Sequence, residues 1–292
     1  MSNGDSSGRI VVVTGAAGGI GAAIAARFAA EDRVVSLWDL DPAVHETAAA
    51  IAATAASANH THPSDDATPH RSDGSAVAAT ASGTGVHGVT VDITDADAVR
   101  AAFDRLTAEY GTVEVLAHAA GVMVGGAALE LDPADWTRCL TVNATGTMLV
   151  TQRAATEMAA AGRGSIVVIS SNAAAAPRVG MAAYGAAKAA AASFTRSLAL
   201  QVAPLGVRVN LVSPGSTDTA MLRDMFGGTP LDDAAQHALL DGDPAAYRLG
   251  IPLRRIAAPA DIASAVHFLA SDGARHITMH DLRVDGGATL DM

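Results

Sequence analysis

Cysteine and long apolar runs are the features that the chain most lacks. A single cysteine, Cys139, excludes an internal disulfide framework and fits a reducing compartment. No apolar run reaches the roughly 18 residues that a membrane-spanning helix needs. Residues 1–8 are polar, lack the basic-then-apolar order of a signal peptide, and are expected to form a disordered tail. We therefore expect a soluble, cytoplasmic protein with no membrane partner.

Positive charge is scarce, and lysine is almost absent. The formal net charge of −11 argues against a nucleic-acid partner, because phosphate binding needs a basic surface. Lys188 is the only lysine, and every other residue of the Lys and Arg total is an arginine. Arginine holds its proton too firmly for proton transfer, whereas the pKa of a lysine can be tuned. The single lysine is therefore a candidate for chemistry.

Potential metal ligands do not gather into a recognisable site. His60, His62, His70 and His87 have no cysteines, regular spacing or rigid frame around them, so we expect no metal. The segment that holds them, residues 58–87, shows no hydrophobic period and little to bury. It predicts a mobile surface insertion.

A tyrosine and the lysine stand one helical turn apart. Tyr184 and Lys188 lie in an alanine-rich run that predicts a helix, and positions i and i+4 of a helix share one face. Ser171 comes shortly before them, after the apolar run 166–169, which predicts a buried strand. A chance pair on a solvated helix is the alternative, but the three residues together predict a catalytic cleft.

A glycine-rich turn follows the first predicted strand, residues 9–14. The segment 15–21 carries glycines at 15, 18, 19 and 21, and a helix is predicted directly after it. Strand, glycine turn and helix form the context of a dinucleotide-binding site, in which the turn and the helix amides hold the pyrophosphate. We assign Gly15, Gly19, Ile20 and Gly21 to cofactor binding.

Two carboxylates end the next strands. Asp39 ends the predicted strand 33–38, where it can accept a hydrogen bond from the 2′-hydroxyl of an adenosine ribose. No arginine directly follows it to hold a 2′-phosphate, so we predict NAD rather than NADP. The alternative is that Asp39 only ends its strand or caps the following helix. Asp92, after the third strand, is a candidate partner of the adenine amino group.

Strands and helices alternate along the whole chain. This order predicts an α/β fold: a single Rossmann-type, doubly wound parallel sheet with helices on both faces, over residues 9–292. The mixed pattern of residues 216–250 predicts a mobile lid over the substrate. Asn143 lies inside the predicted helical run 132–161, where asparagine is unfavourable, so we expect a functional kink there.

Taken together, these motifs resemble the short-chain dehydrogenase/reductase family. The resemblance rests on Thr14-Gly-x-x-x-Gly-Ile-Gly21, Asn143, Ser171, Tyr184-x-x-x-Lys188 and Pro214-Gly215. It implies a base (Tyr184), a hydroxyl that orients the substrate (Ser171), a cation that lowers the tyrosine pKa (Lys188) and a water-holding residue (Asn143). It also implies further cofactor contacts at Ala119, Gly121, Pro214, Gly215, Thr217 and Thr219. One departure is His118, where the family usually has asparagine.

Within that family the chain is similar to dehydrogenases that aromatise 2,3-dihydro-2,3-dihydroxybenzoate. The similarity lies in residues 177–184, 213–219, 250–253 and 276–290. It implies NAD-dependent oxidation of a ring hydroxyl in siderophore or secondary-metabolite biosynthesis, a small substrate that carries a carboxylate, and a homotetramer. We expect Arg178 and Arg223 to bind the carboxylate and Met181 and Met221 to line the ring pocket.

Other functions remain open at this point. The substrate could be a dihydro-3-hydroxyanthranilate or a related cyclohexadiene acid. A short-chain ketoreductase with a different carbonyl substrate is the next alternative. A non-catalytic scaffold that kept the fold is the third, and the intact Ser171, Tyr184 and Lys188 argue against it.

Overall fold

One parallel sheet organises the chain. The computed structural model describes residues 9–31, 33–59, 85–228 and 230–290. The seven strands of this sheet lie in the order β3-β2-β1-β4-β5-β6-β9, and every neighbouring pair is parallel. The strands are β1 (Arg9–Thr14), β2 (Arg33–Asp39), β3 (Gly85–Thr90), β4 (Val113–His118), β5 (Gly164–Ile169), β6 (Val207–Pro214) and β9 (Asp281–Val284). This confirms the predicted fold class.

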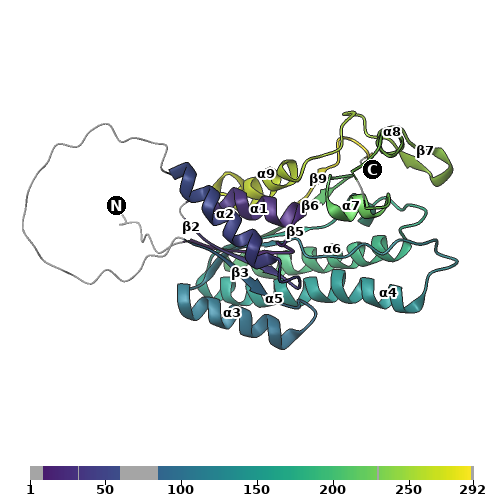
Figure 1. The fold of residues 1–292 in the computed structure, drawn as a ribbon. Coiled ribbons are helices and arrows are strands. Elements are labelled where there is room, and N and C mark those ends of the chain that lie inside the picture. Colours follow the sequence, from purple (N-terminus) through teal and green to yellow (C-terminus); the bar gives the residue numbers. More distant parts are fainter. Residues whose placement is uncertain (1–8, 32, 60–84, 229, 291–292) are drawn as a thin grey trace, which may run out of the picture.

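Helices cover both faces of the sheet. Figure 1 shows α1, α2 and α9 on one side and α3, α5 and α6 on the other. The helices are α1 (Gly19–Ala29), α2 (Val44–Asn59), α3 (Ala96–Tyr110), α4 (Pro133–Leu140), α5 (Thr147–Ala161), α6 (Ala182–Val202), α7 (Ala220–Asp224), α8 (Asp233–Asp241) and α9 (Pro259–Ala270). None of the helices in these described ranges is both long and apolar enough to cross a membrane.

The central strands are apolar along their whole length because both of their faces are covered. Ile10 to Val13 of β1 are at most 1% exposed. Ile10 and Val12 pack into the apolar layer that includes Phe103 of α3, whereas Val11 and Val13 pack into the layer that includes Phe28 of α1. Side chains of a strand point alternately to opposite faces, so β1 joins the two layers.

The strand order reverses between β1 and β4. In a doubly wound sheet, ligands bind outside the carboxyl ends of the strands at this switch point. The segments that follow β4, β5 and β6 therefore meet at one edge. The hairpin strands β7 (Gly242–Asp243) and β8 (Arg248–Leu249) pair with each other beyond the sheet. Figure 1 shows α7, α8 and β7 gathered at the same end, within the predicted lid.

The bounds of the predicted insertion, residues 58–87, are wrong at both ends. Helix α2 continues to Asn59, and β3 begins at Gly85 and pairs with β2 from Val34 onward. The first residues of β3 could not be recognised as a strand from the sequence, because glycine and histidine contribute little to a hydrophobic pattern. The remaining part of that segment and the predicted tail lie outside the described residues, as do His60, His62 and His70.

Candidate functional site

A pocket of about 390 Å³ opens at the carboxyl edge of the sheet. It brings together residues from the glycine turn, from the ends of β4, β5 and β6, and from the predicted lid. The predicted site residues that line it are Ile20, Ala119, Gly121, Asn143, Ser171, Arg178, Met181, Tyr184, Lys188, Pro214, Gly215, Thr217, Thr219 and Met221. Gly15, Gly19, Gly21, Asp39 and Asp92 lie outside its lining.

The glycine turn packs too closely for a side chain at Gly15 and at Gly21. Gly15 has a φ of +67°, and a Cβ there would lie 2.6 Å from the backbone nitrogen of Ala120. A Cβ on Gly21 would overlap the carbonyl oxygen of Gly15. Helix α1 begins without a side-chain cap at Gly18, which leaves its first amides open to a ligand. An uncapped helix N-terminus beside a turn of glycines and alanines fits the pyrophosphate of a dinucleotide.

Asp39 is fixed against the same turn. One carboxylate oxygen accepts a hydrogen bond of 2.9 Å from the amide of Ala17, and the other accepts one of 3.0 Å from the amide of Asp41. The carboxylate therefore sits at the end of β2 beside the turn, where a ribose would lie if the turn held the pyrophosphate. Asp92 instead uses one carboxylate oxygen, Oδ1, to accept from both the amide and the hydroxyl of Thr94, which anchors the side chain within the loop after β3.

Tyr184 and Ser171 both line the pocket. Ser171 lies after β5 and accepts a hydrogen bond from the amide of Ala173. Burial raises the pKa of Tyr184 to about 12, and the hydrogen bond from Ser171 and the charge of Arg178 act in the opposite direction. The phenol is 8% exposed and belongs to a small apolar cluster that includes Cys139.

Lys188 lies one turn further along α6 and is almost fully buried. Its ammonium donates a hydrogen bond of 2.9 Å to the carbonyl of Ile169 and lies 5.9 Å from the centroid of the Tyr184 ring. Burial lowers the lysine pKa to about 8. We expected Lys188 to lower the pKa of Tyr184, but in this geometry burial dominates and the tyrosine pKa is raised.

Asn143 lies in a π-helix, Thr141–Gly146, that separates α4 from α5. The regular α-helix is thus interrupted at Asn143, and single π-turns of this kind are frequent at functional sites. The Asn143 amide donates to the carbonyls of Val122 and Cys139, and its oxygen accepts from the amide of Val122. A Cβ on Gly121 would lie 2.7 Å from that oxygen and 3.3 Å from Lys188 Nζ, so glycine is needed for this close packing.

His118 connects the glycine turn to this π-helix. Its Nδ1 lies 2.8 Å from the hydroxyl of Thr14, and its Nε2 lies 3.0 Å from the hydroxyl of Thr147. Thr147 donates its own proton to the carbonyl of Asn143, so it accepts from His118 Nε2–H, and Nδ1 accepts from Thr14. Burial, with a smaller effect from Lys188, lowers the pKa of His118 to about 3. The imidazole is therefore neutral and structural.

Two arginines line the pocket, but only one of them was predicted. Arg178 lies in the loop before α6, and Arg248 lies in β8. The second predicted arginine, Arg223, does not line the pocket: its guanidinium forms an exposed ion pair of 2.8 Å with Asp218. Arg223 lies near the end of the short helix α7, where its side chain turns to a local carboxylate instead.

Comparisons with known proteins decide the family. Residues 66–289 match the family described as Enoyl-(Acyl carrier protein) reductase. A 2,3-dihydro-2,3-dihydroxybenzoate dehydrogenase of Bacillus subtilis (strain 168) is 36% identical over 283 residues, which cover 97% of this chain and 97% of that protein. The chain belongs to the short-chain dehydrogenase/reductase family. As a member, this dehydrogenase is an oxidoreductase that uses a nicotinamide cofactor on a small-molecule substrate.

Two further relatives agree with this assignment. The vibriobactin-specific 2,3-dihydro-2,3-dihydroxybenzoate dehydrogenase of Vibrio cholerae serotype O1 is 43% identical over 201 residues, which are 69% of this chain and 75% of that protein. A solved short-chain type dehydrogenase/reductase from Mycobacterium ulcerans is 28% identical, with a TM-score of 0.76 over 99% of this chain and 91% of that one. The family resemblance predicted from the motifs is thus confirmed.

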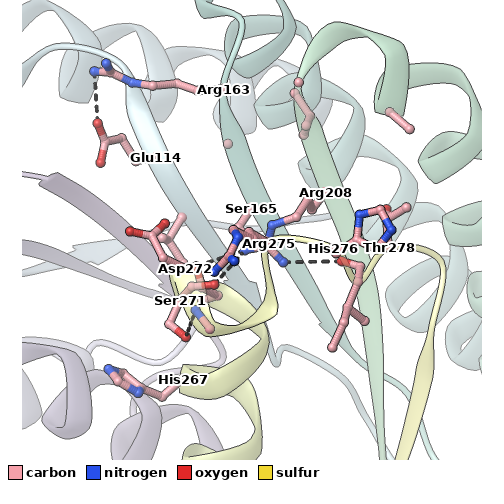
Figure 2. Close-up of a pocket in the computed structure, with 18 of the residues that line it drawn as sticks. Glu114, Arg163, Ser165, Arg208, His267, Ser271, Asp272, Arg275, His276 and Thr278 are labelled. Atoms are coloured by element: carbon pink, nitrogen blue, oxygen red, sulfur yellow. Dashed lines mark hydrogen bonds and ion pairs between the residues drawn. The ribbon is translucent and has the colours of Figure 1, made fainter.

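A larger hollow, about 940 Å³, lies at the opposite, amino-terminal edge of the sheet (Figure 2). Its charged groups are mostly used within the dehydrogenase itself. Arg208 donates to backbone carbonyls at the end of α9, among them those of Leu269 and Ala270, and Arg163 pairs with Glu114. This hollow is far from the glycine turn, and we assign the catalytic site to the smaller pocket.

Five polar residues that line the dehydrogenase pocket were not assigned to the site from the sequence: Ser170, Asn172, Ser216, Asp243 and Arg248. Arg248 lies inside the segment that we interpreted as a lid. A strand of two residues leaves no recognisable hydrophobic pattern, so the sequence did not indicate where the Arg248 side chain points. Ser170 lines the pocket with a buried hydroxyl that has no hydrogen-bond partner among the described residues. Its position beside Ser171, after an apolar strand, was the one available signal.

Proposed function

We propose that the enzyme oxidises a ring hydroxyl of a cyclohexadiene carboxylic acid, similar to 2,3-dihydro-2,3-dihydroxybenzoate, with NAD, in siderophore or secondary-metabolite biosynthesis. The names of the relatives support this substrate class. The observation that carries the proposal is the content of one pocket: the Tyr184 phenol, the Ser171 hydroxyl and the Arg178 guanidinium. Two hydroxyls can hold a reacting C–OH group, and a guanidinium binds a carboxylate.

The residues divide the reaction between them. When bound, the oxidised nicotinamide dinucleotide supplies a hydride acceptor and a positively charged ring. Tyr184 removes the proton of the substrate hydroxyl, and Ser171 donates a hydrogen bond to the same oxygen and holds its geometry. The ring carbon thereby loses a hydride and becomes a carbonyl carbon. Loss of a neighbouring ring proton to solvent, with protonation of that carbonyl oxygen, then gives the aromatic catechol.

Tyr184 needs a lower pKa than its burial gives it. At a pKa of about 12 the phenol is protonated near neutral pH. The groups of the protein that favour the phenolate are the hydroxyl of Ser171 and, second, the charge of Arg178. Lys188, with a pKa near 8, supplies a buried positive charge on the same helix. We propose that these three residues together stabilise the phenolate during the reaction.

The choice of cofactor follows from Asp39. Its carboxylate is held beside the glycine turn by the amides of Ala17 and Asp41. A fixed negative charge there favours the ribose hydroxyl of NAD and repels the 2′-phosphate of NADP. We also propose that residues 216–250 act as a lid, that the enzyme works in the cytoplasm, and that it forms a homotetramer through helices such as the alanine-rich α6.

The decisive experiment is a direct assay of the purified enzyme. NAD or NADP is mixed with 2,3-dihydro-2,3-dihydroxybenzoate, and absorbance is followed at the reduced-nicotinamide band while the catechol is identified by chromatography. We expect rapid reduction of NAD, slow reduction of NADP, and a loss of about 10² to 10⁴ in kcat for Tyr184→Phe. No catechol with either cofactor, together with reduction of simple ketones in the reverse direction, would replace the proposal with a ketoreductase.

A further inference from the structure

Arg178 and Arg248 bring two positive charges to one pocket from distant parts of the chain. Arg178 lies between Ser171 and α6, and Arg248 lies in strand β8 of the hairpin. Both guanidinium groups are partly withdrawn from solvent, and burial lowers the pKa of each. The charge of Arg248 is the next largest influence on Arg178 and lowers its pKa further, so the two cations repel each other.

The hydrogen-bonding capacity of this pair is largely unused. The guanidinium of Arg178 makes no hydrogen bond or ion pair with another residue in the described part of the chain. Arg248 makes two long contacts, 3.3 Å to the hydroxyl of Ser216 and 3.5 Å to the carbonyl of Leu239. A guanidinium has five N–H donors, so most donors of both side chains remain available to a ligand.

Two carboxylates lie near the arginines, but each has other partners. Asp243 lines the pocket and acts on Arg248, yet it caps the short helix Pro244–Ala246 through the amides of Ala245 and Ala246. Asp285 acts on Arg178 from a buried position and accepts hydrogen bonds from the side chain of Asn172 and the amide of Gly287. Neither carboxylate forms an ion pair with Arg178 or Arg248.

Like charges that are half-buried without a direct counterion are unfavourable, because each loses hydration and gains no partner. An anion between them would remove both penalties and could accept paired hydrogen bonds from two planar groups. A carboxylate on a planar ring matches this demand in charge and in size. An anion bound by both arginines would also connect the β7–β8 hairpin to the loop before α6.

We propose that Arg178 and Arg248 form a two-arginine clamp for the carboxylate of the substrate, with Arg248 as the specificity-determining arm on the lid. This rests on the proposed function for the identity of the ring acid. The clamp explains how the enzyme would select carboxylated rings over neutral diols. It also predicts that binding of an acid orders the hairpin, whereas binding of a neutral ring does not.

The test compares binding of an acid and its neutral analogue. Calorimetry with 2,3-dihydroxybenzoate and with 2,3-dihydroxybenzamide is performed on the wild-type enzyme and on Arg248→Ala, with saturating NAD present. We expect Arg248→Ala to weaken binding of the acid about 10- to 100-fold and binding of the amide less than about 3-fold. Arg248→Lys, which keeps the charge, should recover part of the loss.

Arg254→Ala is the matched control. Arg254 lies close by in the chain, but it is exposed and paired with Asp241 outside the pocket, so its removal should leave binding of both ligands unchanged. Equal losses for acid and amide in Arg248→Ala, or no loss for the acid, would overturn the clamp. The binding assay does not depend on turnover, so the two proposals can fail separately. If the enzyme binds the acid through Arg248 but does not oxidise the cyclohexadiene substrate, the proposed reaction is wrong and the two-arginine clamp is still supported.

Discussion

Lys188 and Tyr184 share one face of α6, yet the hydrogen bond of the lysine goes to the carbonyl of Ile169 and not to the phenol. Burial moves the pKa values of the two side chains apart, down to about 8 for the lysine and up to about 12 for the tyrosine. Both shifts disfavour charge. The pair therefore combines a lysine that is costly to keep charged with a tyrosine that is costly to ionise. Such a pair lowers the stability of the fold, so we infer that it is kept for function.

Replacing the buried cation should stabilise the protein and inactivate it. For a lysine with a folded pKa of about 8 and an ordinary value of 10.5, the unfolded chain binds more protons between these pH values. Wild-type stability thus rises relative to Lys188→Met from pH 8 to 10.5, and the cost of the charge is fully present below pH 8. The shift corresponds to roughly 3 kcal/mol, less about 1 kcal/mol for the lost hydrogen bond.

We therefore expect Lys188→Met to unfold with a free energy about 1–3 kcal/mol higher at pH 7, with the gain shrinking toward pH 10.5. Urea unfolding at pH 7 and pH 10 measures both values, and kcat should fall at least about 100-fold. If Lys188→Met is instead less stable than the wild type at pH 7, and by the same free energy at pH 10, the charged lysine carries no burial cost and this prediction is wrong.

His118 should set part of the acid limit of stability. Its folded pKa of about 3 lies below the ordinary 6.5, so the unfolded chain binds an extra proton between these values. The stability that the neutral imidazole provides is complete above pH 6.5 and is lost as the pH falls toward 3. At pH 5 this loss amounts to about 2 kcal/mol.

The variant that tests this is His118→Asn, which replaces the imidazole with a group that does not titrate. Between pH 7 and pH 5 the wild-type protein should lose about 2 kcal/mol more unfolding free energy than the variant. The exposed His280→Asn serves as a control for removal of a histidine. Parallel pH profiles for wild type and His118→Asn would contradict a buried neutral imidazole, whatever the difference in their stability.

The sheet could be predicted from the sequence because its strands are continuous β-branched runs that alternate with helical patterns. Periodicity and composition carry that information directly. Strand β3 shows where this fails: its first residues are glycine, valine and histidine, and only the pairing of Gly85 with Val34 makes them a strand. Such pairing is a contact between distant residues, and no local pattern reports it.

Site residues that sit in motifs could be located for the same reason. Ser171 follows β5, and Tyr184 and Lys188 lie in the first two turns of α6. The positions of both elements are predictable, and the structure places all three residues in one pocket. The sequence could not show which arginine of the predicted lid points into the pocket. Arg223 and Arg248 both lie in the predicted lid, and only the packing of α7 and the β7–β8 hairpin turns one toward Asp218 and the other toward the pocket.

Backbone packing in the glycine turn should make Gly21 far less tolerant than Gly18. A Cβ on Gly21 would overlap the carbonyl of Gly15, whereas a Cβ on Gly18 meets nothing within 4 Å. We expect Gly21→Ala to move the turn, to lower the free energy of unfolding by about 1–3 kcal/mol and to weaken NAD binding by at least about 10-fold. Gly18→Ala should keep NAD affinity within about 3-fold, as measured by fluorescence of the bound reduced cofactor. Equal affinities for the two variants would contradict the assignment of this turn to the pyrophosphate.

The charge of Asp39 gives the sharpest test of cofactor choice. Two unit charges about 4 Å apart interact by about 4 kcal/mol at an intermediate effective dielectric, and partial exposure of Asp39 reduces that value. Asp39→Asn keeps an oxygen that can accept from the amide of Ala17 and removes the charge. We expect kcat/KM to fall about 10-fold for NAD and to rise about 10-fold for NADP, a change of about 100-fold in their ratio.

Asp41→Asn is the matched control for that prediction. Asp41 lies two residues after Asp39 and is exposed. Its carboxylate accepts a hydrogen bond from the amide of Ala43, so its charge is close to that of Asp39 in the sequence but is not held against the glycine turn. If general repulsion of NADP by an acidic protein set the preference, both variants would shift the ratio alike. A shift confined to Asp39→Asn would assign the preference to one carboxylate. Its salt dependence should be weak, because in the proposed complex the charge would lie within a few ångströms of the ribose.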